Sequence, residues 1–377
     1  MNNTYITCET LHIENAFSKS YSKSTKTFSQ THFLLGLIIM VSIKDISLAC
    51  GVSVATVSKA LNDQKDVGAA TKERVKAVAK QMGYVPNSAS QALKTKHSYN
   101  IGVLYKEESE AGLAHDFYAK VLDGIKTTAE QKGYDITFVN NSNMSGGRHL
   151  SYLEHCRYRN FDGVAIVCVD FDDPGVQELI SSEVPVVTID YTVEGHNGIS
   201  SDNIGGMKEL VEYAYTQGHR RIAFIHGVDS YVTRDRIRSF VEACNGFGLE
   251  VPAEYIKEAA YRDTSATYIA TKQLIELKNP PTCILFPDDF AAIGGINCIH
   301  SSGLKIPDDI SCAGFDGIDI SKYLEPPLTT LNQDKHRIGS EAALRLIDII
   351  ENGDKAKNDN VSIPGELFKG GTIGSVK

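Results

Sequence analysis

Short apolar segments alternate with amphipathic segments over most of this 377-residue chain. From residue 99 onward, continuous apolar runs such as NIGVLY, DGVAIVC and PVVTID stand between stretches whose apolar residues recur at helical spacing. A second series follows, with RIAFI, TCILF and ISCAGFD as its apolar runs. Uninterrupted apolar strands that alternate with helices indicate parallel sheets covered by helices on both faces. The two series therefore predict two doubly wound α/β lobes.

The segment at residues 42–62, SIKDISLACGVSVATVSKALN, has a different pattern. Ile46 and Cys50 fall on one face of a first short helix, and Gly51 ends that helix. Ser53 is placed to cap a second helix. This is the layout of a helix-turn-helix, whose second helix enters the major groove of DNA.

Charge is unevenly distributed along the chain. Residues 40–97 hold nine Lys or Arg against four Asp or Glu, whereas the whole chain has a formal charge of −9. A basic head on an acidic body fits a DNA-binding domain joined to a domain that does not touch DNA. The eight cysteines include no C-x-x-C pair. We therefore expect free thiols in a reducing cytoplasm rather than disulfides or a zinc site.

Several classes of protein are disfavoured by what the sequence lacks. No apolar run reaches the roughly 18 residues that a membrane-spanning helix needs. The chain has no G-x-G-x-x-G after a strand, no Walker loop, no G-x-S-x-G and no H-E-x-x-H. We expect no catalytic residue, no metal, no cofactor and no membrane association.

Taken together, the segments resemble the lactose/galactose-repressor (LacI/GalR) family. The similarity begins with the helix-turn-helix segment and continues through TKERVKAVAKQMGYVPN at residues 71–87. GHRRIAFI, FPDDFAAIGGINCI, GLKIPDDISCAGFD and PPLTT extend it in the same order. The resemblance implies an α plus α/β fold. In it, a helix-turn-helix head precedes a two-lobed, periplasmic-binding-protein-like core of doubly wound parallel sheets.

Domain boundaries follow from the resemblance and from the strand pattern. Residues 1–39, which are rich in Ser and Thr at positions 18–31, are expected to be disordered or a non-native extension, with Met40 as the natural start. We expect the DNA-binding domain at 40–85, with its third helix over 71–82, a hinge at 86–98, and an effector-binding and dimerisation domain at 98–377. Within that domain we expect an N-lobe at about 98–202 and 332–358 and a C-lobe at about 203–331 and 359–377.

The resemblance also implies which side chains of the head touch DNA. Val54 and Ala55 match the two positions that most influence operator choice, and apolar side chains there suit thymine methyl groups. Lys59 stands where Arg is common and reaches guanine without the planar fork of a guanidinium. Leu93 matches a hinge leucine that wedges between base pairs. The expected DNA-binding residues are Ser53, Val54, Ala55, Thr56, Ser58, Lys59, Asn62, Asn87 and Leu93.

Polar side chains at the predicted strand ends define a candidate ligand site, because ligands bind at the carboxyl ends of strands in open α/β sheets. Asp190 ends PVVTID, Asp316 ends ISCAGFD, and Asp288 follows CILFP. Ionised carboxylates accept hydrogen bonds from neighbouring sugar hydroxyls. For Asp288 and Asp289, the alternative to ligand binding is helix capping. For Tyr118, the alternative to stacking on a ligand is packing against other side chains. The effector-binding residues implied by the resemblance are Tyr118, Asp190, Arg236, Asp288, Asp316 and Gln333.

The expected function is a cytoplasmic DNA-binding transcription regulator, with a repressor favoured. As a homodimer it would bind a pseudo-palindromic operator in double-stranded DNA. A small effector in the cleft would control it allosterically, with a sugar favoured and a purine or another small metabolite as the alternative. Two rivals remain. One has the same head with a partner-protein corepressor, and the other is an exported solute-binding protein.

Overall fold

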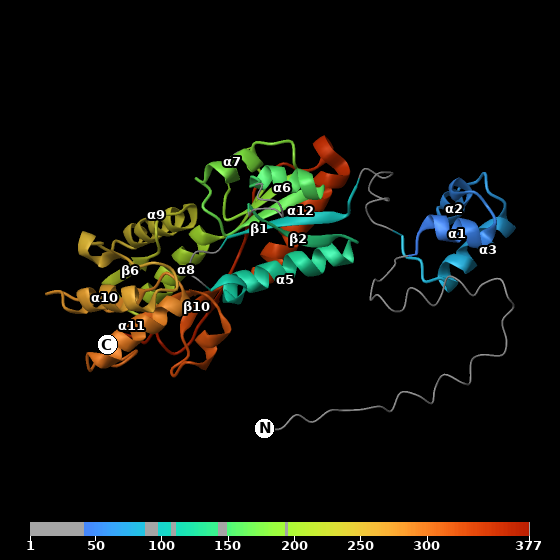
Figure 1. The fold of residues 1–377 in the computed structure, drawn as a ribbon. Helices are drawn as coiled ribbons and strands as arrows, with labels where there is room; N and C mark the ends of the chain where they lie inside the picture. The colour runs from blue at the N-terminus through green and yellow to red at the C-terminus, as the bar shows by residue number, and fades with distance from the viewer. Residues whose placement is uncertain (1–40, 87–96, 107–110, 142–148, 193–194, 377) are drawn as a thin grey trace, which may run out of the picture. The chain divides into compact units, whose positions relative to one another are not determined.

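The computed structural model describes residues 41–86, 97–106, 111–141, 149–192 and 195–376. The chain divides into two compact units, residues 1–90 and 91–377. The described part of the first unit is a three-helix head, and the second unit is a two-lobed α/β body (Figure 1). The extension at 1–39, most of the hinge, and the predicted DNA-binding residues Asn87 and Leu93 lie outside the described residues.

The head consists of α1 (Ile43–Cys50), α2 (Val54–Leu61) and α3 (Ala69–Gln81). The third helix begins earlier than the predicted start at residue 71, because Gly68 takes an extended backbone and serves as its N-cap. One side of each helix is buried against the other two. The side chains at the centre of this small core are fully buried, and they are Ile46, Val57, Ala60 and Val75.

The first lobe is built on a six-stranded parallel sheet with the order β11-β5-β4-β3-β1-β2. Its strands are β1 (Asn100–Tyr105), β2 (Asp135–Val139), β3 (Gly163–Val167), β4 (Val186–Ile189), β5 (Gly198–Ser201) and β11 (Val361–Ile363). Its helices are α5 (Asp116–Gln131), α6 (Tyr152–Arg159), α7 (Pro174–Ile180) and α12 (Lys335–Asn352).

The second lobe repeats this plan with the strand order β12-β10-β9-β8-β6-β7. Among the described strands of this sheet, β12 at the edge runs antiparallel to its neighbour and the others are parallel. The strands are β6 (Ile222–His226), β7 (Ile256–Glu258), β8 (Cys283–Leu285), β9 (Ser311–Asp316), β10 (Thr329–Asn332) and β12 (Glu366–Phe368). The helices are α8 (Asn203–Thr216), α9 (Tyr231–Gly246), α10 (Thr264–Ile275) and α11 (Asp289–Ser301).

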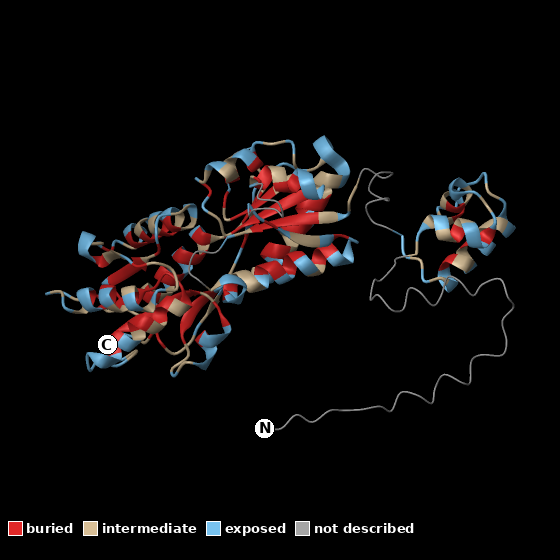
Figure 2. Ribbon diagram, in the orientation of Figure 1, coloured by how far each residue is buried: buried red, intermediate tan, exposed pale blue. Residues whose placement is uncertain are grey.

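Each sheet is covered by helices on both faces, as the continuous apolar strands predict (Figure 1). Buried residues fill the layers between sheets and helices, and exposed residues line the outside (Figure 2). In the first lobe α5 and α12 pack unusually closely. A side chain at Gly124 would meet the backbone oxygen of His336 at 2.2 Å, and one at Gly339 would meet that of Val121 at 1.9 Å.

The chain passes between the two lobes three times: after β5, after β10, and between β11 and β12. The third passage differs from the boundary predicted at residues 358 and 359. β11 pairs with β5, so residues 361–363 belong to the first lobe's sheet. Within the described residues, no helix is both long enough and apolar enough to span a lipid bilayer.

Candidate functional site

Local hydrogen bonds and a left-handed glycine fix the start of α1, the turn that follows it and the start of α2. Ser42 and Asp45 form a capping box at the start of α1, in which the Ser42 backbone N donates to the Asp45 carboxylate at 2.9 Å. Gly51 ends α1 with a φ of 64°, a left-handed conformation that glycine adopts without strain. Ser53 then caps α2, and its hydroxyl accepts from the Thr56 backbone N at 3.1 Å. These contacts make the predicted helix-turn-helix.

The second helix of the head has a buried face and a solvent face. Val57 and Ala60 point into the core of the head. On the other side Val54 is 47% exposed, and Ala55 and Lys59 are also exposed. An apolar tip on an exposed helix face suits contact with thymine methyl groups in a major groove. This geometry is compatible with the predicted DNA contacts, which stay predictions.

Several of the predicted DNA-binding side chains have partners within the head. Lys59 forms an ion pair with Asp66, and both side chains are about half exposed. The Asn62 side-chain amide donates to the backbone oxygen of Ser58. An exposed ion pair contributes only about 0–1 kcal/mol, so Lys59 can exchange Asp66 for a phosphate or a base at small cost.

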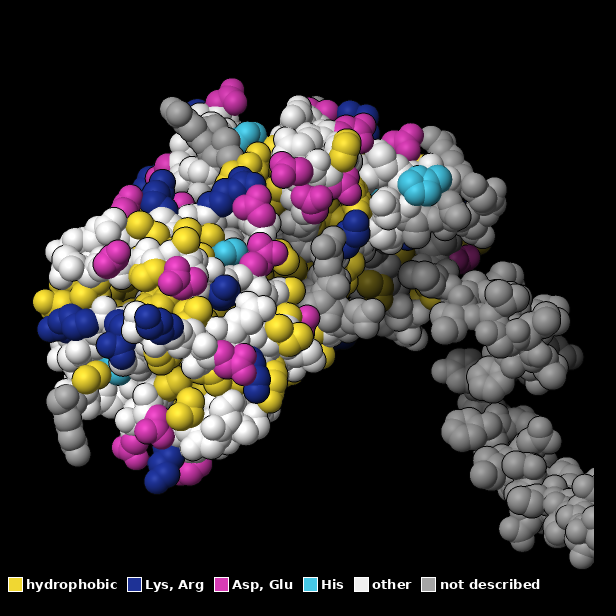
Figure 3. Space-filling model, turned by 90° about the vertical axis from the view of Figure 1, so that its left-hand side faces the viewer, with side chains coloured by type: hydrophobic (Ala, Val, Ile, Leu, Met, Phe, Trp, Pro, Cys, Tyr) yellow, Lys and Arg dark blue, Asp and Glu magenta, His cyan; other side chains and the backbone are white. Residues whose placement is uncertain are grey.

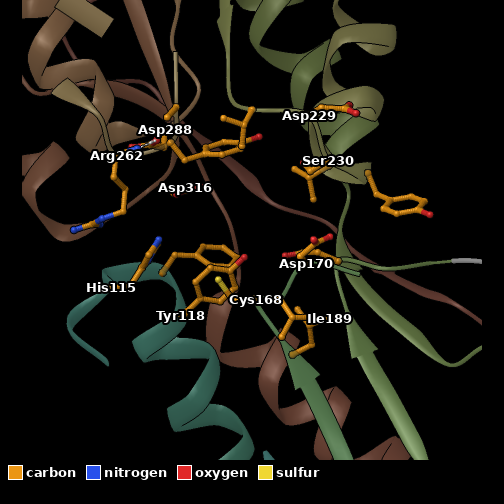
Figure 4. A pocket seen from close by; sticks show the side chains of 18 of the residues that line it. His115, Tyr118, Cys168, Asp170, Ile189, Asp229, Ser230, Arg262, Asp288 and Asp316 are labelled. Carbon is orange, nitrogen blue, oxygen red and sulfur yellow. Dashed lines mark hydrogen bonds between the residues drawn. The ribbon is translucent and has the colours of Figure 1, made fainter. Parts of the chain in front are cut away.

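A cleft of about 920 Å³ lies between the two lobes of the body. The side chains labelled in Figure 4 face this space from both lobes. The cleft lies at the carboxyl ends of strands, where open α/β sheets bind ligands. All six residues predicted to bind the effector line it, although they come from widely separated segments: Tyr118, Asp190, Arg236, Asp288, Asp316 and Gln333.

Two of these residues occupy strained backbone positions at strand ends. Asp190 follows β4 with a φ of 65°, and Asp316 ends β9 with a φ of 106°. Such conformations are unfavourable for residues other than glycine and are concentrated at functional sites. Burial raises the pKa of Asp190 to about 6 and that of Asp316 to about 7, and the nearby Arg236 partly opposes this rise. Both carboxyl groups therefore titrate close to neutral pH.

Arg236 is the buried cation of the cleft, and only 4% of its surface is exposed. Its Nε donates to the Asn203 side-chain oxygen at 2.8 Å, and its Nη1 donates to the backbone oxygen of Pro287 at 3.0 Å. The guanidinium carbon lies 3.6 Å from the ring centroid of Phe315, a cation–π contact. These contacts hold the plane of the guanidinium in one orientation.

Asp288 and Asp289 divide the roles that the sequence left open. Asp288 is the N-cap of α11, and its two oxygens accept from the backbone N atoms of Ala291 at 2.7 Å and Arg262 at 2.8 Å. Asp289 is fully buried behind the cleft, where one oxygen accepts from the Ile318 backbone N at 2.8 Å. Burial raises the pKa of Asp289 well above its usual value. Asp288 therefore combines capping with a place in the cleft lining, and Asp289 anchors the turn after β9.

Tyr118 both packs and faces the cleft, so neither alternative is eliminated. Its ring centroid lies 4.8 Å from that of His115, 5.0 Å from that of Phe117 and 5.9 Å from that of Tyr105. Gln333 has a clearer local role, because its side-chain N donates to the Asp316 carboxylate at 2.5 Å. This hydrogen bond orients the Asp316 carboxylate.

Two contacts that join the lobes beside the cleft were not foreseen from the sequence. Arg262 of the second lobe forms an ion pair with Asp116 of the first lobe, with an N–O distance of 3.0 Å. Tyr231 at the start of α9 packs edge-on against Tyr191 of the first lobe, with ring centroids 4.9 Å apart. No motif marks these residues, because only the packing of the two lobes brings each pair together.

Cys168 was also missed, although a signal for it was present. It follows β3 directly, has a φ of 52° and lines the cleft. The rule of strand ends that selects Asp190 applies equally to this cysteine. The other described cysteines are buried free thiols, and no group of three His, Cys, Asp or Glu residues in the described ranges is arranged to hold a metal ion.

Comparisons with known proteins agree with both parts of this architecture. Residues 42–87 match the family of bacterial regulatory proteins of the lacI type, and residues 211–373 match a periplasmic binding protein-like domain. The chain is 31% identical to the transcriptional repressor PurR of Aliivibrio fischeri over 323 residues, which cover 84% of this chain and 93% of PurR. It is 29% identical to the repressor CytR of Escherichia coli over 310 residues, which cover 81% and 89% of the two chains.

A solved structure extends the comparison to the fold. A Lac repressor dimer bound to operator and the anti-inducer ONPF superposes with a TM-score of 0.75 at 26% identity, covering 89% of this chain and all of the repressor chain. The similarity thus spans head and body together. The chain belongs to the LacI family of bacterial regulatory proteins.

Proposed function

We propose that this protein is a transcriptional repressor that binds a pseudo-palindromic operator as a homodimer. Residues 40–85 would form its DNA-binding domain, and the residues after the hinge would bind an effector and dimerise. A small ligand in the cleft, with a sugar favoured, would control operator binding. The single observation that carries the proposal is the joining, in one chain, of a helix-turn-helix with an exposed α2 face and a body with a large interlobe cleft.

The DNA contacts that we propose divide into two kinds. The exposed tip of α2, with Val54 and Ala55, would contact base edges and set sequence preference. Ser53, Thr56 and Ser58 offer hydroxyl groups to phosphates or base edges, and contacts to phosphates orient the protein without reading sequence. In a dimer, two such helices would meet two half-sites about one helical turn apart.

The ligand contacts that we propose centre on the buried carboxylates. Asp190 and Asp316 would accept hydrogen bonds from ligand hydroxyls, and Arg236 would donate from the opposite side. Tyr118 would lie against an apolar face of the ligand. Because the cleft is lined by both lobes, a ligand that contacts both shifts the equilibrium between arrangements of the lobes. A difference in operator affinity between these arrangements would provide the allosteric coupling.

We further propose that the protein acts on DNA within the cell and catalyses no reaction. Its relatives PurR and CytR are transcriptional repressors, which supports a regulatory rather than an enzymatic role. The aspartates of the cleft have structural or ligand-binding explanations without a chemical step. Operator-bound Lac repressor, its structural neighbour, is a dimer, which supports the proposed assembly.

Selection of a binding site from random double-stranded DNA by the purified full-length protein tests this proposal. Fluorescence anisotropy then compares the selected site with an unrelated sequence at several salt concentrations. Lys59→Ala should weaken binding to the selected site more than binding to unrelated DNA, if Lys59 contacts bases. Lys80→Ala, on the exposed surface of α3, is the matched control and should change the two affinities equally or not at all. Failure to select any sequence would overturn the proposal.

A further inference from the structure

The lining of the cleft is unusually rich in carboxylates. Among the residues that the structure describes, seven aspartates line the cleft against four basic side chains. The aspartates are Asp170, Asp172, Asp190, Asp229, Asp263, Asp288 and Asp316, and the basic residues are Lys106, Arg234, Arg236 and Arg262. Elsewhere, on the face of the molecule seen in Figure 3, Lys and Arg side chains are interspersed with Asp and Glu side chains. An excess of one charge sign in a recessed, low-dielectric site creates a strong local potential.

Three of the four basic side chains are already paired with carboxylates. Arg234 pairs with Asp229 at 2.5 Å, and Arg262 pairs with Asp116 at 3.0 Å. The Lys106 ammonium lies 4.0 Å from the carboxylate of Asp173. An anionic ligand that paired with any of these cations would have to displace its carboxylate partner. That carboxylate would remain close to the ligand and carry a charge of the same sign.

Among the described lining residues, Arg236 is the remaining basic side chain that can face a ligand, but its surroundings do not favour an anion. Two of its guanidinium nitrogens donate to Asn203 and Pro287, and its plane lies against Phe315. Its positive charge also interacts with the carboxylates of both Asp190 and Asp316. A phosphate or carboxylate placed beside Arg236 would therefore also lie near two partly buried carboxylates.

The partly buried carboxylates of Asp190 and Asp316 retain capacity to accept hydrogen bonds. Within the described residues, no hydrogen bond or ion pair reaches the side chain of Asp190, whose charge interacts with that of Arg236. The carboxylate of Asp316 receives a side-chain hydrogen bond from Gln333. Carboxylate oxygens only accept while they are ionised, so they are complementary to hydroxyl or amine donors and not to other acceptors.

We propose that this cleft selects an uncharged, hydroxyl-rich ligand and rejects its phosphorylated or carboxylated counterpart. The inference rests on the proposed role of the cleft as the effector site, and it adds the charge class of the effector. It predicts that sugar phosphates, sugar acids and nucleotides bind far more weakly than the matching neutral sugars and nucleosides. Like charges that face each other in a desolvated interface provide this kind of negative selection.

Cys168 gives a direct test that needs no knowledge of the ligand. Its thiol lines the cleft, whereas the other described cysteines are buried. In a full-length Cys8→Ser background, the rate of thiol modification is measured with the cationic 2-(trimethylammonium)ethyl and the anionic 2-sulfonatoethyl methanethiosulfonates. The cation-to-anion rate ratio is divided by the same ratio for free 2-mercaptoethanol. A Cys168→Ser variant identifies the signal from this thiol.

At pH 8 and low salt, where Asp190 and Asp316 are largely ionised, we expect a normalised ratio of about ten or more, because a charged cleft changes the local concentration of ions by at least this factor. Asp190→Asn combined with Asp316→Asn should bring the ratio toward one. Asp319→Asn, on an exposed side chain outside the lining, should leave it unchanged. A normalised ratio of one or below would overturn the proposal, whether or not the protein binds an operator.

Matched ligands supply the second measurement. Thermal stability is recorded with D-glucose, D-glucuronate and glucose 6-phosphate, with the galactose and ribose series, and with adenosine and AMP. We expect any ligand that stabilises the body to be the neutral member of its set, with the anionic members at least 100-fold weaker. Preferential binding of an anionic member would overturn the charge class. A panel without any hit, together with a normalised ratio above ten, would count against the sugar assignment and leave the charge class supported by the rate ratio.

Discussion

The head and the body build their candidate sites in opposite ways. In the head, one short segment supplies the turn, the caps and the exposed face of α2. In the body, the cleft draws one residue or a few from many distant segments, from Tyr118 on α5 to Gln333 after β10. The first site is therefore a local property of the chain, and the second depends on the complete packing of both lobes.

The two sites also differ in how far their side chains are exposed to solvent. Val54 and Lys59 are exposed on the head, and the ion pair of Lys59 is solvated. Asp190 and Asp316 are partly buried in the cleft, and their desolvation raises the pKa of each carboxyl group. An exposed face suits binding to a large, hydrated polyanion, whereas a desolvated cleft amplifies each hydrogen bond to a small ligand. The predictions below separate these two designs.

The largest expected effect is the selective unfolding of the head. Ile46 is fully buried among its three helices, so Ile46→Ala should destabilise the head by about 3 kcal/mol. A three-helix unit of this size has little stability in reserve, and we expect operator binding to disappear. Calorimetry should show an unchanged unfolding transition for the body.

Leu48→Ala is the matched control on the same helix, because Leu48 is 74% exposed. It should leave both operator binding and the body transition unaltered. An Ile46→Ala protein that still binds its operator with full affinity would show that the head is held together by more than its own core.

A second effect concerns the pH dependence of the body. The folded-state pKa values of Asp190 and Asp316, about 6 and about 7, lie above the usual value of 3.8. The folded protein therefore holds more protons than the unfolded chain between about pH 4 and pH 7, and its stability falls as the pH rises through this window. Asp316→Asn should stabilise the body at pH 8 by up to about 4 kcal/mol, since the pKa lies about three units above its usual value and one pKa unit corresponds to about 1.4 kcal/mol.

Denaturant unfolding at pH 5 and pH 8 measures this difference. The asparagine oxygen can still accept from Gln333, so the hydrogen bond survives the substitution. Asp319→Asn serves as the control, because the Asp319 side chain is 77% exposed. Equal stability changes for the two variants at pH 8 would contradict the burial of the Asp316 charge.

The smallest expected effect concerns the ion pair that links the lobes. Asp116→Asn removes its negative charge but leaves Arg262 over the ring of Phe290, at 4.3 Å. Because Asp116 is half exposed, we expect ligand affinity to fall only about two- to threefold, with a weaker dependence on salt. Titration calorimetry with the ligand found in the panel measures this change.

Asp123→Asn, at an exposed position on the same helix, provides the comparison. It should leave both the affinity and its salt dependence as they are in the unmodified protein. A tenfold or greater loss for Asp116→Asn would show that this contact controls closure of the cleft rather than merely assisting it.

How far the sequence predicts a site depends on how local the site is. The capping residues Ser42 and Ser53 and the left-handed Gly51 lie next to the helices they delimit, so pattern and propensity were sufficient there. Strand-end aspartates were found by a topological rule, and Asp190 and Asp316 do face one cleft. The same rule gave no warning that Asp288 rather than Asp289 caps α11, because both residues stand at the junction of strand and helix.

The sequence by itself determined the class of each unit and the order of its elements, since apolar periodicity and turn residues act over a few positions. It also determined membership of a family whose signatures lie along the chain. Only the tertiary structure decided that β11 joins the first lobe, that Arg262 meets Asp116, and that burial brings two carboxyl groups close to neutral pKa. Pairing, contact and desolvation depend on which distant segments share a space, and the spacing of residues along the chain does not encode that directly.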